Sequence, residues 1–209
     1  MEVEVASRRI GVFGGTFDPI HIGHLVIAEE ARVAYGLERV VFVPARISPH
    51  KLGVTPASGE DRCEMVRLAV HDNPAFDVSR VDLDRAGPSF TVDTLRSLHA
   101  EYGSATQLYF VMGADSLLAF KAWHKPKEIL RLTRLIVVTR PGYALDLAAL
   151  DRELPGIAAA TGVLDSISLD ISATDLRARV RQGRPIRYQV PCAVARYIAE
   201  HQLYAADQA

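Results

Sequence analysis

Two histidines that follow a pair of glycines are the residues of this chain best suited to chemistry. Residues 14–24 read Gly-Gly-Thr-Phe-Asp-Pro-Ile-His-Ile-Gly-His, so His21 and His24 are three residues apart. If a helix begins near His21, both imidazoles lie on one face of it. Two rings on one face can point at one phosphate group, each donating a hydrogen bond to a phosphoryl oxygen, and a protonated ring would add positive charge there.

The elements around this motif have to position it. The apolar run at 10–13 predicts a buried parallel strand, and the apolar spacing over 25–31 predicts a helix after the turn. Gly14 and Gly15 let backbone amides approach an anion, and the start of a helix favours negative charge. The turn has neither the Gly-x-Gly-x-x-Gly spacing of dinucleotide folds nor a Gly-Lys-Ser/Thr ending. The sequence therefore predicts a phosphate site of another kind.

Two other interpretations of the histidine pair are open. The rings could be metal ligands, but no Cys, Asp or Glu at a recognisable spacing completes a set, and we expect no metal bound by the protein. The rings could also be caps or surface residues at a helix start, although the glycine turn and Pro19 beside them disfavour this.

Composition limits the class of protein. The chain has 209 residues with a net charge of −1, which fits one domain and disfavours a nucleic-acid partner. No apolar run approaches the roughly 18 residues of a membrane span, and the acidic start is no signal peptide. We expect a cytoplasmic protein without a membrane partner, and a homo-oligomer remains open. Cys63 and Cys192, in helical contexts, have no zinc or disulfide spacing and are expected to be inert packing residues.

Helix and strand patterns alternate along the chain, which predicts an α/β fold with a mostly parallel sheet. We expect one domain over 1–209, with a C-terminal helical portion at about 173–209. Loops that follow parallel strands gather at one edge of the sheet, so the glycine turn, loop 44–57 and segment 113–115 should meet in one crevice. The expected strands are 39–43, 76–81, 107–112, 135–139 and 163–169, and the expected helices are 59–71 capped by Ser58, 92–102, 126–132 and 147–153.

A second candidate phosphate grip lies near the end of the chain, in residues 170–177, Asp-Ile-Ser-Ala-Thr-Asp-Leu-Arg. Ser172 or Thr174 can cap a helix there, and Arg177 would lie on the same side as Thr174, three residues on. Taken alone, this is an ordinary capped helix.

Together these segments resemble the His-x-Gly-His nucleotidyltransferase superfamily, and most closely the bacterial nicotinate-nucleotide adenylyltransferases. Residues 14–25 resemble their opening signature and 171–177 their Ile-Ser-x-Thr-x-x-Arg signature. Between these, Pro49-His50-Lys51, 88–95, Gly113-Ala114-Asp115 with Trp123, and Arg140-Pro141-Gly142 resemble further family motifs. The resemblance covers nearly the whole chain and implies a Rossmann-like, doubly wound sheet with helices on both faces.

The resemblance also implies an activity: transfer of the adenylyl group of ATP to nicotinate mononucleotide, with Mg²⁺ arriving on the triphosphate. Related acceptors, nicotinamide mononucleotide or phosphopantetheine, and a non-catalytic nucleotide-binding regulator are the alternatives. The catalytic residues implied are His21, His24, Lys51 and Arg177. The implied ATP site comprises Gly14, Gly15, Thr16, Phe17, His21, His24, Gly113, Asp115, Ile171, Ser172, Thr174 and Arg177, and the implied mononucleotide site comprises Gly15, Lys51, Thr91, Trp123, His124 and Arg140.

Overall fold

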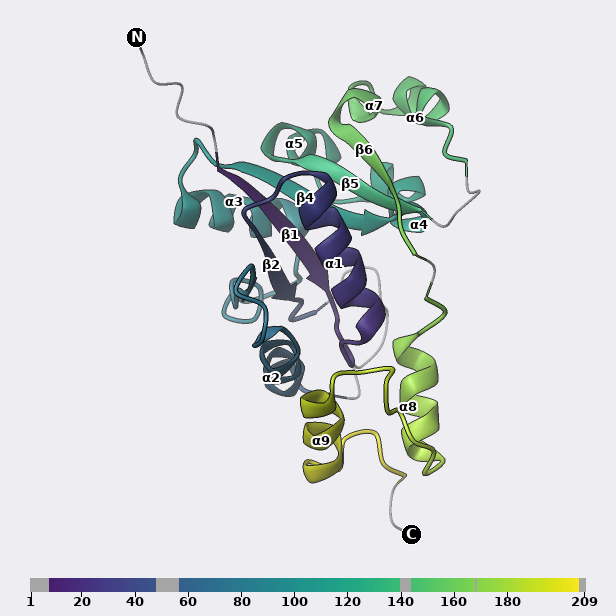
Figure 1. The fold of residues 1–209 in the computed structure, drawn as a ribbon. Helices are drawn as coiled ribbons and strands as arrows, with labels where there is room; N and C mark the ends of the chain where they lie inside the picture. The colour runs from purple at the N-terminus through teal and green to yellow at the C-terminus, as the bar shows by residue number, and fades with distance from the viewer. Residues whose placement is uncertain (1–7, 48–56, 140–143, 168, 207–209) are drawn as a thin grey trace.

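The fold is a six-stranded parallel sheet in the order β3-β2-β1-β4-β5-β6, with helices on both faces (Figure 1). The computed structural model describes residues 8–47, 57–139, 144–167 and 169–206. This strand order is that of a doubly wound Rossmann-like sheet, whose order reverses between β1 and β4. The strands are β1 (Arg9–Gly15), β2 (Arg39–Pro44), β3 (Phe76–Val78), β4 (Gln107–Gly113), β5 (Arg134–Thr139) and β6 (Thr161–Asp165).

Two outer strands differ from the prediction. β3 ends at Val78 rather than at residue 81, because the chain turns away once Ser79 has donated its backbone N–H to Phe42 O. β6 begins at Thr161, which pairs with Leu135, and ends at Asp165, four residues before the predicted end at 169. Both are edge strands, where one neighbour instead of two fixes the length.

The helices lie where the apolar periodicity places them, with short additions. The predicted helix at 59–71 is observed over Gly59–Val70 with Ser58 as its cap, and 147–153 is observed as predicted. Three added segments, at 114–118, 120–122 and 157–160, are too short to show a helical period. The helices are α1 (Ile22–Ala34), α2 (Gly59–Val70), α3 (Thr91–Tyr102), α4 (Ala114–Leu118), η1 (Phe120–Ala122), α5 (Pro126–Leu132), α6 (Leu147–Glu153), α7 (Ile157–Ala160), α8 (Ala173–Arg181) and α9 (Cys192–Glu200).

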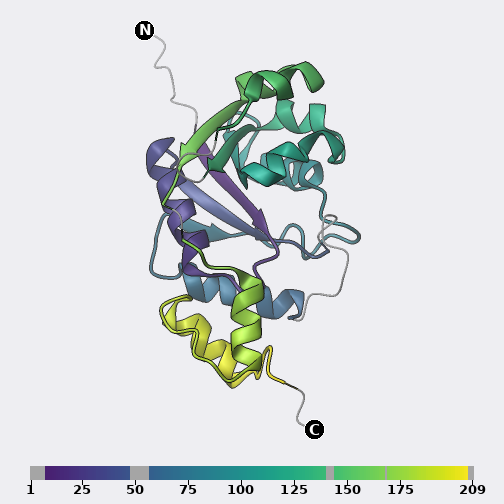
Figure 2. The ribbon, with the colours of Figure 1, turned by 90° about the vertical axis from the view of Figure 1, so that its right-hand side faces the viewer.

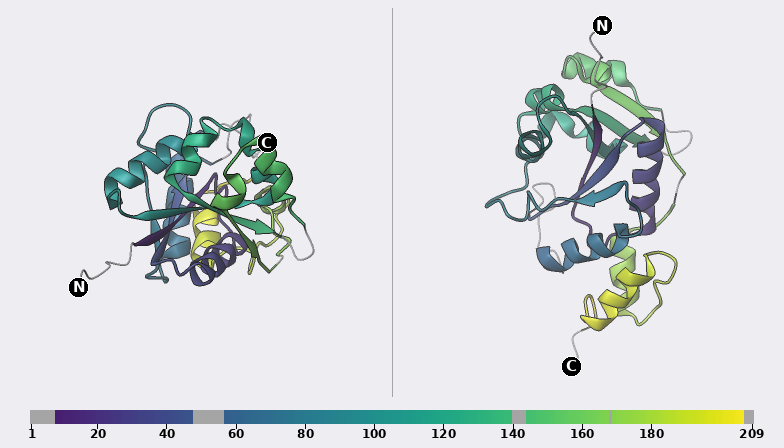
Figure 3. Two further views of the ribbon diagram at one scale, coloured as in Figure 1. Left: turned by 90° about the horizontal axis from the view of Figure 1, so that it is seen from above. Right: turned by 60° about the vertical axis from the view of Figure 1, so that its left-hand side comes forward.

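Alternation along the strands divides the core into two layers. Phe42 and Val111 face one side, where α1 and α2 cover the sheet and buried residues of α8 and α9 belong to the same core layer. Val41 and Phe110 face the other side, under α3, α4, η1, α5, α6 and α7. In the view from above, α1 and α3 lie on opposite sides of the sheet (Figure 3). The central strands β1, β2, β4 and β5 are thus apolar on both sides, as buried parallel strands are, whereas the edge strands β3 and β6 also carry exposed residues.

The C-terminal helices α8 and α9 lie beyond the end of the sheet to which β1 points, beside α2 (Figures 1 and 2). Leu176, Val194 and Ile198 bury their side chains in the same core layer as α1 and α2. The prediction of inert packing is wrong for Cys192, which is exposed at the start of α9, and right for Cys63, which is buried on α2. No helix in the described parts of the chain is long and apolar enough to cross a membrane.

Candidate active site

The two histidines form a stacked pair at the start of α1. His21 is the residue before the helix and His24 is its third residue, and their ring centroids are 3.7 Å apart with 27° between the ring planes. The backbone N–H of His21 donates to Nδ1 of His24 over 3.2 Å. Because Nδ1 accepts, the ring hydrogen of neutral His24 is on Nε2. This geometry confirms that the two rings share one face, with His24 Nε2–H as a defined donor.

His21 differs from its neighbour in burial. Its side chain is 8% exposed, and its Nδ1 has no hydrogen-bond partner among the described residues. Burial lowers the pKa of His21 from 6.5 to about 4, so the ring is neutral at pH 7. The neutral ring of His21 offers an N–H donor instead of a charge. A polyphosphate beside the ring would raise this pKa again.

The glycine turn is closely packed on the core side of the histidines. A Cβ atom on Gly15 would lie 2.8 Å from the ring of Phe17, so this position has no room for a side chain. Phe17, predicted to contact ATP, is 3% exposed, and its ring meets the ring of His24 edge-on at 5.2 Å. Phe13 at the end of β1 also meets His24 edge-on, at 5.9 Å. Two phenylalanines therefore support the His24 ring from the core side.

The second predicted phosphate grip reaches the same loop. Ser172 caps α8 by accepting from the backbone N–H of Asp175 at 3.1 Å, as one of the two predicted caps. Arg177 donates through Nη1 to the backbone oxygen of Asp18 at 2.7 Å and through Nη2 to Thr174 Oγ1 at 3.3 Å. Residues 159 positions apart in the sequence are thereby joined, and the arginine is brought to the turn that carries the histidines.

Sequence reasoning missed a buried arginine that holds this turn from the opposite side. Arg62 on α2 is 1% exposed, and its Nη1 donates to the backbone oxygen of Thr16 at 2.7 Å. Burial lowers its pKa, and the charge of Asp18 opposes that effect. One signal could have identified it: Arg62 precedes Met65 and Val66 by three and four residues, so it lies on the apolar face of its helix.

A pocket of about 590 Å³ opens beside the turn, at the carboxyl ends of β4, β5 and β6. Gly113 and exposed Asp115 line it, as does Phe13, whose ring contacts His24. The walls combine apolar side chains with polar groups, among them Asp115, Thr139 and Ser166, which suits a nucleoside with its flat base and its ribose hydroxyls. The remaining lining residues are Ile27, Val111, Met112, Ala114, Val138, Ile167 and Leu169.

The residues predicted to hold the pyridine ring lie around the start of α3. Thr91 is the first residue of this helix, and no side chain caps the helix at Phe90, so its first backbone N–H groups can receive a carboxylate. The ring of exposed His124 lies 4.5 Å from that of Phe90. Trp123 is half-buried and meets Phe110 edge-on at 6.0 Å. The structure thus offers the flat ring of Trp123 for stacking and the uncapped start of α3 for an anionic group.

Buried hydrogen bonds fix the entry to α3. The carboxylate of Asp82 accepts from Thr94 Oγ1 at 2.6 Å, and burial raises its pKa. Ser89 Oγ accepts from the backbone N–H of Arg46 at 2.9 Å, which joins the segment before α3 to the chain leaving β2. These residues were not predicted, and they hold Thr91 in place.

Two predicted residues, Lys51 and Arg140, lie outside the described residues. Ile171 is half-buried just before α8. Among the described residues, no group of three or more His, Cys, Asp and Glu side chains could hold a metal ion. The structure therefore brings together the turn, both histidines and Arg177, with the Asp115 pocket beside them.

Comparison with known proteins defines the class. The sequence matches the cytidylyltransferase-like family over residues 12–179, most of the chain and all of the site described above. The chain therefore belongs to this family of nucleotidyltransferases. The fold agrees with this assignment: a Plasmodium falciparum nicotinic acid mononucleotide adenylyltransferase complexed with NaAD superposes with a TM-score of 0.75 at 17% identity, covering 94% of this chain and 97% of that one.

The curated relatives reported next share one named activity. The chain is 50% identical to a probable nicotinate-nucleotide adenylyltransferase from Roseiflexus sp. (strain RS-1), over 96% of this chain and 100% of the relative. A protein of the same name from Herpetosiphon aurantiacus is 43% identical over 95% of this chain and 100% of its own length. At this identity over nearly full length, the chain is a nicotinate-nucleotide adenylyltransferase.

Proposed function

We propose that this protein joins the 5′-phosphate of nicotinate mononucleotide to the α-phosphorus of ATP, with His21, His24 and Arg177 acting on the phosphates. An oxygen of the mononucleotide phosphate forms the new P–O bond, the bond to the β-phosphate breaks, and pyrophosphate leaves. The observation that carries this proposal is the pairing of the stacked histidines with Arg177, which Asp18 O holds at the same turn.

The phosphate attacks as an anion, so no general base is required and catalysis can rest on alignment and charge stabilisation. His24 Nε2–H donates to a non-bridging oxygen of the α-phosphate, since its Nδ1 is engaged by His21 N–H. Arg177 supplies positive charge, and one of its two amino groups is already fixed on Asp18 O. Lys51, from the resemblance, would add a further cation.

The nucleoside of ATP would occupy the pocket lined by Gly113 and Asp115. The carboxylate of Asp115 can accept from ribose hydroxyls, and its charge disfavours a phosphate there. This places the base on the apolar side of the pocket and leaves the triphosphate to the glycine turn and α1.

Nicotinate mononucleotide would bind with its pyridine ring against Trp123 and its carboxylate at Thr91 and the backbone beside His124. The uncapped start of α3 supports an anionic ring substituent at this place, because backbone N–H groups without intrahelical partners favour negative charge. An amide in that position would gain less from the helix start.

Mg²⁺ would be held by triphosphate oxygens and water, because the described residues offer no metal cage of their own. Bound in this way, the ion neutralises charge on the leaving pyrophosphate.

Pyrophosphate release by the purified protein tests the proposal, with ATP and, in separate reactions, nicotinate mononucleotide, its amide and phosphopantetheine. We expect turnover with the nicotinate compound, formation of nicotinate adenine dinucleotide by chromatography, and lower kcat/KM with the amide. Activity with phosphopantetheine alone would overturn the assignment of nicotinate mononucleotide as the substrate. A folded protein that binds ATP but shows no turnover with any acceptor would overturn the proposed enzymatic activity.

A further inference from the structure

The turn that carries the histidines is tied to the last described residues of the chain through Asp18. Asp18 is 4% exposed, and its carboxylate accepts a hydrogen bond from the hydroxyl of Tyr204 at 2.6 Å. The backbone oxygen of the same residue accepts from Arg177 at 2.7 Å. One residue of the turn therefore receives two donors from the C-terminal segment, one of them a proposed phosphate ligand.

The Tyr204 contact is buried and charge-assisted. Tyr204 is 8% exposed, and burial together with the bond to Asp18 raises its pKa far above the ordinary range, so its hydroxyl remains a donor. Arg62 and Arg177 both interact electrostatically with Tyr204. Asp18 thus lies among two guanidinium groups and a phenol, where a lost partner leaves a buried carboxylate oxygen unsatisfied.

Backbone conformation shows that both ends of this contact are held by their surroundings. Phe17, directly before Asp18, has a φ of 50°, and Tyr204 has a φ of 62°. Residues other than glycine adopt this left-handed region at a cost and keep it only when neighbouring contacts fix it. Release of the hydroxyl contact would therefore let both segments move toward ordinary conformations.

We propose that Tyr204 is a positioning residue for adenylyl transfer: its bond to Asp18 sets the conformation of the turn and, through Asp18 O, the place of Arg177 relative to His21 and His24. This proposal rests on the proposed function. The C-terminal helical portion is then a working part of the active site, because it supplies both Arg177 and the tyrosine that holds the turn against it.

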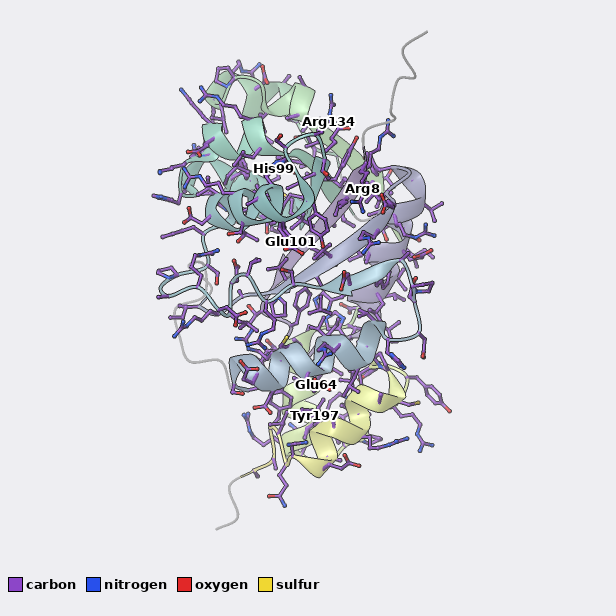
Figure 4. All side chains as sticks on the ribbon, turned by 90° about the vertical axis from the view of Figure 1, so that its left-hand side faces the viewer. Arg8, Glu64, His99, Glu101, Arg134 and Tyr197 are labelled. Carbon is purple, nitrogen blue, oxygen red and sulfur yellow. The ribbon has the colours of Figure 1, made fainter. Side chains whose placement is uncertain are left out.

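The same segment contains a matched contact that does not reach the turn. Tyr197 on α9 donates to the carboxylate of Asp61 at the start of α2, over 2.9 Å. Figure 4 shows Tyr197 beside α2, near Glu64. Tyr197→Phe removes one tyrosine–aspartate bond between the C-terminal segment and the body of the protein, as Tyr204→Phe does. Comparison of the two variants therefore distinguishes an effect on the packing of the C-terminal segment from an effect on the conformation of the turn.

The test is a comparison of single-turnover rates, KM values and melting temperatures of Tyr204→Phe and Tyr197→Phe. We expect Tyr204→Phe to lower the rate of the chemical step by about tenfold or more, as small misplacements of reacting groups do, with both KM values little changed. Tyr197→Phe should lower the melting temperature less, because its contact with Asp61 is only partly buried, and should keep the wild-type rate. Equal rate losses in the two variants, or a wild-type rate in Tyr204→Phe, would overturn the proposal.

A second pair keeps the proposal testable if Tyr204→Phe folds poorly. Asp18→Asn retains an oxygen that can accept from Tyr204, whereas Asp18→Ala does not. We expect the asparagine variant to keep most of the rate and the alanine variant to lose as much as Tyr204→Phe. Equal losses in both Asp18 variants would assign the effect to charge and overturn a role for the hydroxyl contact.

Nitrogen chemical shifts of the histidine rings provide a readout independent of activity. In the wild type, His24 should show a single Nε2–H tautomer, because its Nδ1 accepts from His21 N–H. Tyr204→Phe should shift these resonances toward mixed tautomers, and Tyr197→Phe should not. If the wild type has no turnover, the proposed function fails, and the ring shifts still decide whether Tyr204 sets the turn. Unchanged shifts in Tyr204→Phe would refute the coupling.

Discussion

Replacement of His24 separates its two nitrogens, which have different tasks in the structure. Nδ1 accepts from the backbone N–H of His21, and Nε2–H is the proposed donor to the α-phosphate. His24→Ala removes both, and the loss of one transition-state donor costs about 10²–10³ in kcat, or about 3–4 kcal/mol. Asparagine and glutamine distinguish the two roles, because their amide groups reach the positions of Nδ1 and Nε2, respectively.

We expect His24→Asn to keep an acceptor for His21 N–H, and so the fold, while losing about as much turnover as His24→Ala. His24→Gln should regain part of that loss, because its amide places an N–H donor near the position of Nε2. The assay is steady-state pyrophosphate release at saturating ATP and nicotinate mononucleotide, with circular dichroism to establish that each variant is folded.

His99→Gln is the matched control. Nε2 of His99, on α3, contacts the backbone oxygen of Leu132 at 2.8 Å, and Figure 4 shows this residue among the α3 and α5 side chains, far from α2 and α9. This variant should keep turnover near the wild-type value. A fully active His24→Asn would refute the assignment of Nε2 as the catalytic donor and leave His24 a structural role through Nδ1.

Three further predictions concern ring stacking, pH and packing. Trp123→Ala should weaken mononucleotide binding about tenfold, from the loss of one aromatic stacking contact, with ATP affinity retained; an unchanged calorimetric Kd would refute stacking. The pKa of His21 is lowered from 6.5 to about 4, so its contribution to stability is complete above pH 6.5 and about 3 kcal/mol is lost as pH falls through 4. In His21→Asn, the free energy of unfolding, measured with denaturant, should change less with pH between 6.5 and 4 than in the wild type. A pH dependence equal to that of the wild type would contradict the effect of burial on His21. Gly15→Ala should destabilise the protein by about 1–3 kcal/mol, because the new Cβ would lie 2.8 Å from the ring of Phe17. Gly113→Ala is the control, because a Cβ there would meet open space. Equal urea concentrations at the unfolding midpoints of the two variants would disprove this prediction.

The sequence predicted those parts of the protein that depend on local pattern. Apolar periodicity placed β1 and the helix after it, and the cap of α2 followed from Ser58. The shared face of the two histidines could be predicted because residues three apart are neighbours on a helix surface, whereas the stacking of their rings is seen only in the structure. Short elements such as α4 escaped prediction because five residues are too few to show a period.

Other features of the structure depend on which distant segments come into contact, and the local sequence pattern does not indicate those contacts. The exposure of Cys192 is set by what packs against the start of α9, and neighbouring residues do not reveal it. Asp82 was overlooked because its partner Thr94 is twelve residues away and neither residue type is unusual in a loop or a helix.

The two kinds of functional residue differ for a chemical reason. A group that is to bind phosphate must be a donor of definite type at a definite position, so His21 and Arg177, which we propose act on the phosphates, have a recognisable signature. A group that holds the turn binds mainly backbone oxygens, as Arg62 does at Thr16, and every residue has such an oxygen, so only the donor is specified. Arg62 therefore shows only its place on the apolar face of α2, and Tyr204, which donates to the Asp18 carboxylate, is a type of residue that is common in helical segments. Without donors at both sides of the turn, the histidines would have no fixed place from which to carry out the proposed chemistry.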